Sequence, residues 1–265
     1  MPRLINSQTT GYSKMSLTKR IIPVLLTRDG MLVKGKQFNS SRVVGNVQQA
    51  AEIHQGREVD EMLVLDVGAT VRNQTPDCDM VSGLTEKCFM PITVGGGIRS
   101  IEHVRDLLAS GADKVVIGTL ALDEPEMIYE FSSKFGSQAI TVAVDAVLDS
   151  GGWFITSRCG RETHFYSAVA FAQDMERLGA GELIVTNIKN DGMMRGYDIG
   201  LIRAIAKVVS IPIIANGGCG SYEHMHRALQ AGADAVAAGS FFQWTNNTPL
   251  GAARYLAKKG WEVRS

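Results

Sequence analysis

The chain has 265 residues, of which 45% are hydrophobic and only 20% are charged. Its 27 Lys and Arg residues are balanced by 27 Asp and Glu residues, so the formal net charge is zero. A neutral chain gives no electrostatic reason to bind nucleic acid or an anionic membrane. No apolar stretch approaches the roughly 18 uninterrupted residues that a membrane-spanning helix needs. The length is greater than that of most single domains, but it is usual for an α/β barrel with a large core.

The first 16 residues are polar and lack the hydrophobic region of a signal peptide. We therefore expect residues 1–16 to be a flexible N-terminal extension and residues 17–265 to form a single domain. Neither the cysteines nor the five histidines show metal-ligand spacing, and no flavin or nicotinamide motif is present. This pattern favours a cytoplasmic protein with reduced thiols and without a metal or other cofactor. The cysteines are Cys78, Cys88, Cys159 and Cys219.

Eight short apolar segments, each typical of a buried strand, alternate with amphipathic segments typical of helices. The expected strands are residues 21–26, 62–67, 92–94, 115–117, 140–144, 183–186, 211–215 and 235–238. The expected helices are residues 47–54, 102–109, 126–135, 168–178, 201–209, 224–231 and 250–259. Alternating strands and helices predict a parallel sheet, and eight units predict a closed (β/α)8 TIM barrel. Continuous apolar runs further predict strands that are buried on both faces.

Three of the connections that follow expected strands are long. They cover residues 27–45, 68–79 and 146–166. In a (β/α)8 barrel the connections after strands lie at the catalytic face. We therefore expect these three loops to determine substrate specificity.

One segment, residues 91–103, occurs again as residues 212–224, at an offset of 121 residues. In each copy an apolar run ends in glycines, a serine opens a helix, and a Gly-Ala-Asp turn leads to a second apolar run. Glycines allow the backbone to approach a ligand closely, and the N–H groups of such turns suit a phosphate. The repeat therefore predicts a duplicated half-barrel with one phosphate site on each half, and a ligand with two phosphates.

Several motifs in combination resemble the cyclase subunit of imidazole glycerol phosphate synthase, over about residues 19–264. They include Val33-Lys-Gly35, Thr93-Val-Gly-Gly-Gly-Ile-Arg99, Ala143-Val-Asp145 and Asp191-Gly-x-x-x-Gly-Tyr-Asp198. The resemblance implies a barrel built from two half-barrels that takes ammonia from a glutaminase partner. It also implies that this ammonia is used to split and cyclise a bisphosphorylated ribonucleotide.

Carried over position by position, the resemblance implies phosphate-binding residues on each half of the barrel. Those of the first half are Gly96, Gly97, Gly118 and Thr119. Those of the second half are Asp191, Gly192, Gly217, Gly218, Gly239 and Ser240.

The family's chemistry implies two aspartates, at the ends of strands 1 and 5, that act as general acid and base. Asp145 occupies the strand 5 position, whereas the strand 1 position holds Leu26, which cannot transfer a proton. Asp29 lies three residues further along and would have to reach back to replace the missing carboxyl group.

The resemblance also implies a ring of four charged residues that gates the ammonia entrance at the opposite end of the barrel. The matching residues are Arg20, Glu61, Lys114 and Glu182. Any one of them could be an ordinary solvent-facing charge at the start of a strand. All four together, with the implied signs, favour a retained ammonia conduit.

Three functions remain open at this point. Leu26 favours a paralogue that passes ammonia to a sugar amidotransferase, which makes an acetamidino sugar for surface polysaccharide. The alternative is a cyclase of histidine biosynthesis with full or residual activity, because losing one acid–base group typically slows a reaction by about 10²–10⁴-fold. The third is a non-catalytic subunit that senses a phosphosugar and activates a glutaminase. The ammonia acceptor cannot be identified from the residues alone.

Overall fold

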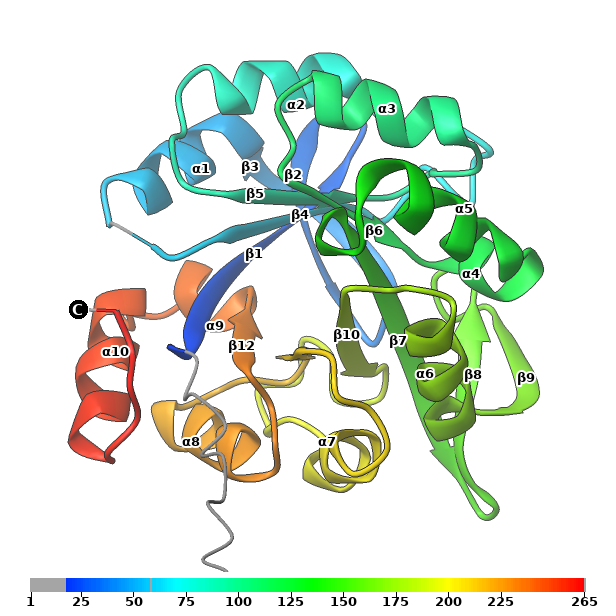
Figure 1. Ribbon diagram of the computed structural model, residues 1–265. Coiled ribbons are helices and arrows are strands. Elements are labelled where there is room, and N and C mark those ends of the chain that lie inside the picture. The colour runs from blue at the N-terminus through cyan, green and yellow to red at the C-terminus, as the bar shows by residue number, and fades with distance from the viewer. Residues whose placement is uncertain (1–17, 58, 265) are drawn as a thin grey trace, which may run out of the picture.

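The computed structural model describes residues 18–57 and 59–264, and these form a closed barrel of eight parallel strands (Figure 1). The strands follow one another around the barrel in the order β1-β4-β5-β6-β7-β10-β11-β12, and pairing of β12 with β1 closes it. The expected extension at residues 1–16 lies outside the described residues. The barrel strands are β1 (Arg20–Arg28), β4 (Met62–Asp66), β5 (Ile92–Gly95), β6 (Lys114–Ile117), β7 (Ile140–Asp149), β10 (Glu182–Asn187), β11 (Ile213–Asn216) and β12 (Ala235–Ala238).

Helices cover the outside of the barrel, so the (β/α)8 prediction is confirmed, and all eight expected strands are present. We did not predict α2 or the two short helices α4 and α9, which directly follow Gly118 and Gly239. The helices α4 and α9 contain only five and four residues, which is too short to show a 3.6-residue apolar period. The helices are α1 (Val47–Gln55), α2 (Cys78–Thr85), α3 (Ile101–Ala109), α4 (Thr119–Asp123), α5 (Glu126–Phe135), α6 (Ala168–Arg177), α7 (Ile199–Ala206), α8 (Tyr222–Gln230), α9 (Ser240–Gln243), α10 (Pro249–Lys258) and the 3₁₀ turn η1 (Ser137–Ala139).

Two of the three long connections are β-hairpins, which corrects the expectation of loops there. The first hairpin consists of β2 (Met31–Lys36) and β3 (Asn39–Asn46), and β2 pairs antiparallel with the end of β1. The second consists of β8 (Gly152–Ser157) and β9 (Glu162–Ser167), and β8 pairs antiparallel with the end of β7. Both hairpins include exposed residues, so their strands lack the continuous apolar runs of the barrel strands.

The half-barrel duplication extends well beyond the repeated segment. An offset of 121 residues relates β2 to β8, α2 to α7, β5 to β11, and β6 to β12. The helix caps follow the same offset. Ser100 accepts a hydrogen bond from the N–H of His103 at the start of α3, and Ser221 accepts one from His224 at the start of α8. Local capping chemistry is therefore repeated along with the fold.

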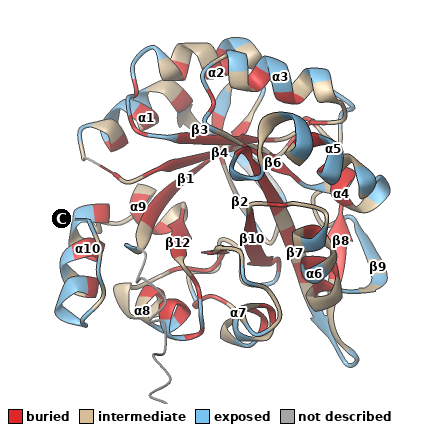
Figure 2. Cartoon of the chain, in the orientation of Figure 1, coloured by how far each residue is buried: buried red, intermediate tan, exposed pale blue. Residues whose placement is uncertain are grey.

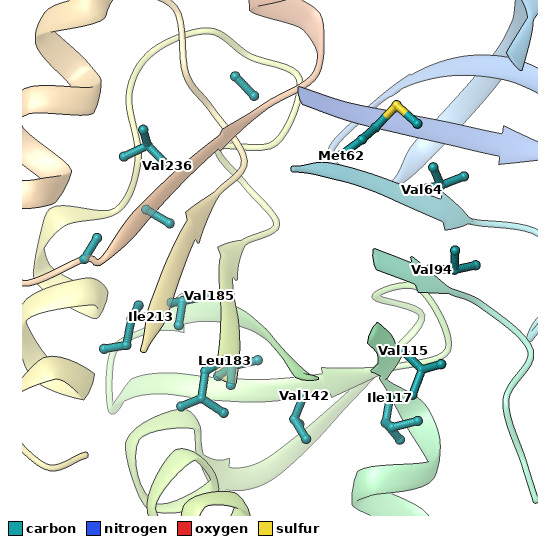
Figure 3. Close-up of a cluster of buried hydrophobic side chains, with 14 of the residues drawn as sticks. Met62, Val64, Val94, Val115, Ile117, Val142, Leu183, Val185, Ile213 and Val236 are labelled. Atoms are coloured by element: carbon teal, nitrogen blue, oxygen red, sulfur yellow. The ribbon is translucent and has the colours of Figure 1, made fainter. Parts of the chain in front are cut away.

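The barrel strands are buried on both faces, as their apolar sequences predict. Figure 2 shows that the barrel strands and the inner sides of the helices are largely buried, while the outer sides of the helices are exposed. Outward-pointing side chains such as Met62, Val64 and Val94 pack against the helices, and Figure 3 shows part of this cluster. Inward-pointing side chains form a second cluster inside the barrel, which includes Ile22, Leu63, Val116, Ile184 and Ile214. Each fully buried aliphatic side chain contributes about 1.5–3 kcal/mol to folding.

No helix in the described part of the chain combines the length and the apolar character needed to cross a bilayer.

Two buried threonines at the inner face of the barrel differ in their hydrogen bonding. The Thr93 hydroxyl donates to Oε1 of Glu61 at 2.6 Å. The Thr141 hydroxyl has no partner among the described residues, although Thr141 pairs in register with Glu182 and Val116. An unpaired buried hydroxyl destabilises the folded state relative to a methyl group of the same shape.

We therefore expect Thr141→Val to raise the free energy of unfolding by about 1 kcal/mol, and Thr93→Val to lower it by a similar amount. The two substitutions make the same chemical change on neighbouring faces of the barrel interior, so each is the control for the other. Urea denaturation would measure both. A loss of stability in Thr141→Val would show that the hydroxyl is hydrogen-bonded in solution.

Candidate functional site

A cavity of about 710 Å³ opens at the carboxyl ends of the barrel strands. This volume suits a small-molecule ligand, and this end of a (β/α)8 barrel is the one that carries active sites. The structure places every predicted phosphate-binding residue of both halves in the wall of this cavity, together with Leu26 and Asp145. These residues are Gly96, Gly97, Gly118, Thr119, Asp191, Gly192, Gly217, Gly218, Gly239 and Ser240.

The glycine pairs after β5 and β11 adopt backbone angles that favour glycine, with φ of +115° at Gly96 and +99° at Gly218. A Cβ atom at Gly96 would lie 2.4 Å from the carbonyl oxygen of Asp66, and one at Gly218 would lie 2.3 Å from that of Gly196. Packing between loops therefore requires these glycines even without a ligand. Gly118 differs, because a Cβ atom there would have no atom within 4 Å.

The strand register identifies Leu26 and Asp145 as equivalent positions of the two half-barrels. Leu26 pairs with Leu65 in β4, and Asp145 pairs with Thr186 in β10. Leu65 and Thr186 are related by the same offset of 121 residues as the repeat. Leu26 packs against the apolar cluster inside the barrel. The cavity therefore has a carboxyl group at one strand end and an apolar side chain at the equivalent end of the other half.

Asp29 does not reach back into the cavity. It lies in the turn between β1 and β2 with φ of +54°, and its side chain is 64% exposed. Its carboxylate forms an ion pair with Arg72 at 3.0 Å. The carboxyl group missing at Leu26 is therefore not supplied by Asp29 in this structure.

Asp145 has the electrostatics of a group that can exchange a proton near neutral pH. Burial raises the pKa of Asp145 to about 7, a hydrogen bond from Thr186 partly opposes this effect, and the negative charge of Asp191 adds to it. Burial likewise raises the pKa of Asp191 to about 6, against hydrogen bonds from the backbone N–H groups of Gly192 and Phe38. A pKa near the working pH suits a general acid or base.

Both hairpins line the cavity and form hydrogen bonds with residues at its rim. The N–H of Gln37, in the first hairpin, donates to the carbonyl oxygen of Asp191 at 2.9 Å. The N–H of Arg158, in the second hairpin, donates to the Thr119 hydroxyl at 2.9 Å. The adjacent Cys159 contacts Val67, and burial raises the pKa of its thiol to about 11, so it is protonated at neutral pH. The predicted long connections therefore contribute directly to the walls of the site.

Cationic side chains also line the cavity, and we did not predict them as site residues. The sequence contains one feature that could have identified them. Arg99 lies two residues after the triple glycine in the first copy of the repeat, whereas the second copy has Gly220 at the equivalent position. Lys34 lies within a motif that resembles the family. The cavity-lining cations are Arg28, Lys34, Arg72, Arg99, Arg158 and Arg161. Within the described residues, no group of three or more His, Cys, Asp or Glu side chains could hold a metal ion.

At the other end of the barrel, the four charged residues expected at the ammonia gate form a closed ring of ion pairs. Arg20 contacts Glu61 at 2.5 Å and also contacts Glu182. Lys114 lies 3.2 Å from Glu61 and 3.0 Å from Glu182. Both glutamates are buried. Burial alone would raise the pKa of Glu61, but the charges of Arg20 and Lys114 outweigh it and lower that pKa, so the carboxylate stays ionised.

This ring lies directly below the cavity. Lys114 and Val116 are successive inward-pointing residues of β6, and Val116 lines the cavity. Glu182 and Ile184 stand in the same relation on β10. Two residues of a strand span about 6.6 Å. Only a thin apolar layer therefore separates the ring from the cavity floor.

Comparison with known proteins identifies relatives over nearly the whole chain. Residues 20–248 match the family model described as histidine biosynthesis protein. The chain is 39% identical over 248 residues to imidazole glycerol phosphate synthase subunit HisF of Thermococcus onnurineus, covering 94% of this chain and 98% of that one. It is also 39% identical over 249 residues to subunit HisF of Chlorobaculum tepidum, covering 94% of this chain and 99% of that one.

We expect Asp145→Asn to stabilise the fold at neutral pH. An unfolded chain ionises Asp145 at its ordinary pKa of 3.8, whereas the folded chain holds the proton to a pKa of about 7. The carboxyl group therefore lowers stability as the pH rises from 3.8 to 7. The gain in Asp145→Asn should approach about 4 kcal/mol above pH 7 and vanish near pH 4, as measured by urea denaturation across this range. A gain that does not change with pH would mean that Asp145 has an ordinary pKa in the folded state.

We expect Lys114→Met to lower the free energy of unfolding by about 2–4 kcal/mol, because it leaves two buried carboxylates with Arg20 as their remaining partner in the ring. Lys87→Met is the matched control, because Lys87 pairs with Glu52 at the surface and both side chains are about half exposed. That control should change stability little. Equal effects of the two substitutions, measured by urea denaturation, would contradict a coupled buried ring.

Proposed function

Because the chain belongs to the histidine biosynthesis protein family, we propose that it is the ammonia-using, cyclase-type subunit of a glutamine amidotransferase of the imidazole glycerol phosphate synthase kind. Both relatives are named as subunits of imidazole glycerol phosphate synthase. These names support histidine biosynthesis rather than the polysaccharide function that Leu26 suggests.

The observation that carries this proposal is the arrangement of two features along one axis. The ring of Arg20, Glu61, Lys114 and Glu182 lies at the amino ends of the strands. The cavity lies at their carboxyl ends, one apolar layer away. Ammonia that enters through the ring would reach the cavity without passing through bulk water. A partner that releases ammonia must then dock at the ring face, and we propose that this partner is a glutaminase.

The residues on the Asp145 side of the cavity suit the cyclase reaction. The backbone of the glycine loops and the surrounding arginines would hold a phosphorylated ligand. Asp145, with its pKa near 7, would accept a proton from the attacking ammonia or return one to a leaving group. Burial is the main cause of the raised pKa of Asp145, and the negative charge of the neighbouring Asp191 adds to it.

Leu26 is the specific observation that favours a second candidate. It provides an apolar surface where the other half-barrel presents Asp145, so proton transfer from that side has no donor in this position. A barrel of this kind could pass its ammonia to another enzyme, such as a sugar amidotransferase, without cyclising a ligand itself. A subunit that only activates a glutaminase is a third possibility with the same docking face.

Ammonium-driven turnover of the bisphosphorylated intermediate of histidine biosynthesis distinguishes these functions. We expect slow turnover by the native protein and an increase of about 10²–10⁴-fold in Leu26→Asp, because the second acid–base group is restored. Leu26→Asn is the matched control, since it is polar and of similar size but does not ionise. The rate of product formation with saturating ammonium chloride would measure the effect.

Two outcomes would contradict the proposed cyclase. If neither the native protein nor Leu26→Asp turns over the intermediate while a glutaminase still binds, the ammonia serves another acceptor. If no glutaminase binds, or if Glu61→Ala leaves glutamine-driven turnover unchanged, the conduit is not used. Full turnover by the native protein would instead show that another group replaces the missing carboxyl.

A further inference from the structure

The barrel interior between the ion-pair ring and the cavity contains a polar side chain that lacks a hydrogen-bond partner. Thr141 of β7 is completely buried, and its hydroxyl group forms no hydrogen bond with any described residue. Its neighbours Ile140 and Val142 belong to the outer cluster that packs against the helices, so Thr141 points into the barrel. Buried polar groups in native proteins almost always have partners, and an exception needs an explanation.

The strand register places Thr141 at the boundary between the ring and the apolar layer above it. Strand β7 lies between β6 and β10 in the barrel (Figure 1). On the β10 side Thr141 pairs with Glu182, which belongs to the ring. On the β6 side it pairs with Val116, which belongs to the inner apolar cluster. A small molecule that leaves the ring on this side of the barrel therefore meets Thr141 first.

Two threonines lie on the strands that flank Lys114, and they differ in what they offer to a molecule inside the barrel. Thr93 of β5 pairs in register with Lys114, and its hydroxyl donates to Oε1 of Glu61 at 2.6 Å. The Thr141 hydroxyl makes no such bond to Glu182, whose carboxylate contacts Lys114 at 3.0 Å. The hydroxyl proton of Thr93 is thus used within the ring, whereas that of Thr141 is available to a guest molecule.

Beyond Thr141, the same strand offers a lightly obstructed way to the cavity. The inward residues of β7 are in order Thr141, Ala143 and Asp145, and two residues of a strand span about 6.6 Å. Ala143 lines the cavity with only a methyl group, whereas the neighbouring strands place the larger Val116 and Ile184 there. The way along β7 ends at Asp145, whose pKa of about 7 suits it to accept a proton from ammonia.

The small residues of β12 provide an alternative way, and the comparison favours β7. Ala235 and Ala237 point into the barrel, but the described strand consists only of Ala and Val. Strand β12 pairs with β1, whose inward residue at the cavity end is Leu26. Ammonia on that side would find no side-chain hydroxyl group within the strand and no carboxyl group at the end of β1.

We propose that ammonia crosses the barrel along β7, and that the Thr141 hydroxyl is its transient binding site between the ring and Asp145. This inference rests on the proposed function, since it assumes that ammonia enters through the ring. The hydroxyl stays unpaired until ammonia passes, when it donates a hydrogen bond to the ammonia nitrogen and accepts one from an N–H group. The ligand is neutral ammonia, because a charged ammonium ion would lose its hydration in the apolar layer.

Glutamine-driven turnover in the complex with a glutaminase tests the binding site. We use the Leu26→Asp background, in which turnover is expected to be faster. There Thr141→Val should lower glutamine-driven turnover about fivefold, the effect of one average hydrogen bond. Turnover with saturating ammonium chloride should not change, because that ammonia enters through the cavity mouth. Thr141→Ser keeps a hydroxyl group and should retain the coupling. Equal losses in both assays, or no loss in either, would overturn the binding site.

A larger side chain at Ala143 should obstruct the way along β7. We expect Ala143→Ile to lower the amount of product formed per glutamine hydrolysed, because ammonia that cannot pass escapes into solution. Ala237→Ile is the matched control, since it makes the same change at an inward alanine of β12. That variant should keep the coupling. A loss of coupling in Ala237→Ile but not in Ala143→Ile would reject the route along β7.

Methyl NMR of the isolated barrel separates this inference from the proposed function, because it requires neither a glutaminase nor turnover. Isotope-labelled Thr and Ala methyl groups report on each position, and Thr141→Val and Ala143→Ile identify the two signals by their absence. Ammonium chloride at high pH, where ammonia is largely neutral, should shift both signals. The same salt at neutral pH, and sodium chloride at high pH, should not.

The combined results distinguish the possible failures. Ammonia-dependent shifts of Thr141 and Ala143 without any turnover would support the route and reject the cyclase. Coupled turnover that is insensitive to Thr141→Val and Ala143→Ile, with no shift of the Thr141 signal, would leave the cyclase standing and reject the route. An equal shift of the Ala237 signal would also reject a route confined to β7.

Discussion

The two-residue alternation of side chains along a closed barrel strand is the constraint on which the rest of this structure depends. Every second residue points inward, so successive inward positions stack from the amino end of a strand to its carboxyl end. On β10 these positions are Glu182, Ile184 and Thr186, which belong in turn to the ion-pair ring, the apolar interior and the cavity wall. A shift of one residue in register would expose the ring charges to the helical layer and destroy all three levels together.

This stacking also explains how a duplicated fold can diverge without losing its architecture. The outward positions that pack against helices stay apolar in both halves, because the core requires it. The last inward position of each strand faces the cavity and is free of that requirement. Leu26 and Asp145 differ at one such position, and the loops beyond the strands differ further at Arg99 and its counterpart Gly220. Divergence is therefore concentrated where a ligand would sit.

The fold was largely predictable from the sequence, because barrel strands are apolar on both faces and short gaps separate them from amphipathic helices. The hairpins were not, because a strand such as β9 has no buried residue and no apolar pattern of its own. Instead, β9 pairs with β8, which in turn pairs with the end of β7. The positions of Asp145 and the ring residues followed from the resemblance to a known family. Their electrostatics did not, because the pKa of Asp145 depends on burial and on Asp191, which is 46 residues away in the sequence.

Leu26 and Asp145 occupy equivalent positions but have opposite effects on the stability of the folded state. An apolar side chain at the position of Leu26 packs into the barrel interior and stabilises the folded state. A carboxyl group at the equivalent position is disfavoured in its ionised form, which is why burial raises the pKa of Asp145 to about 7. The hydrogen bond from Thr186 only partly offsets this effect. Folding therefore accounts for Leu26 but not for Asp145. A group that a protein holds at a loss of stability, in a cavity lined by arginines, is best explained by chemistry on a bound ligand.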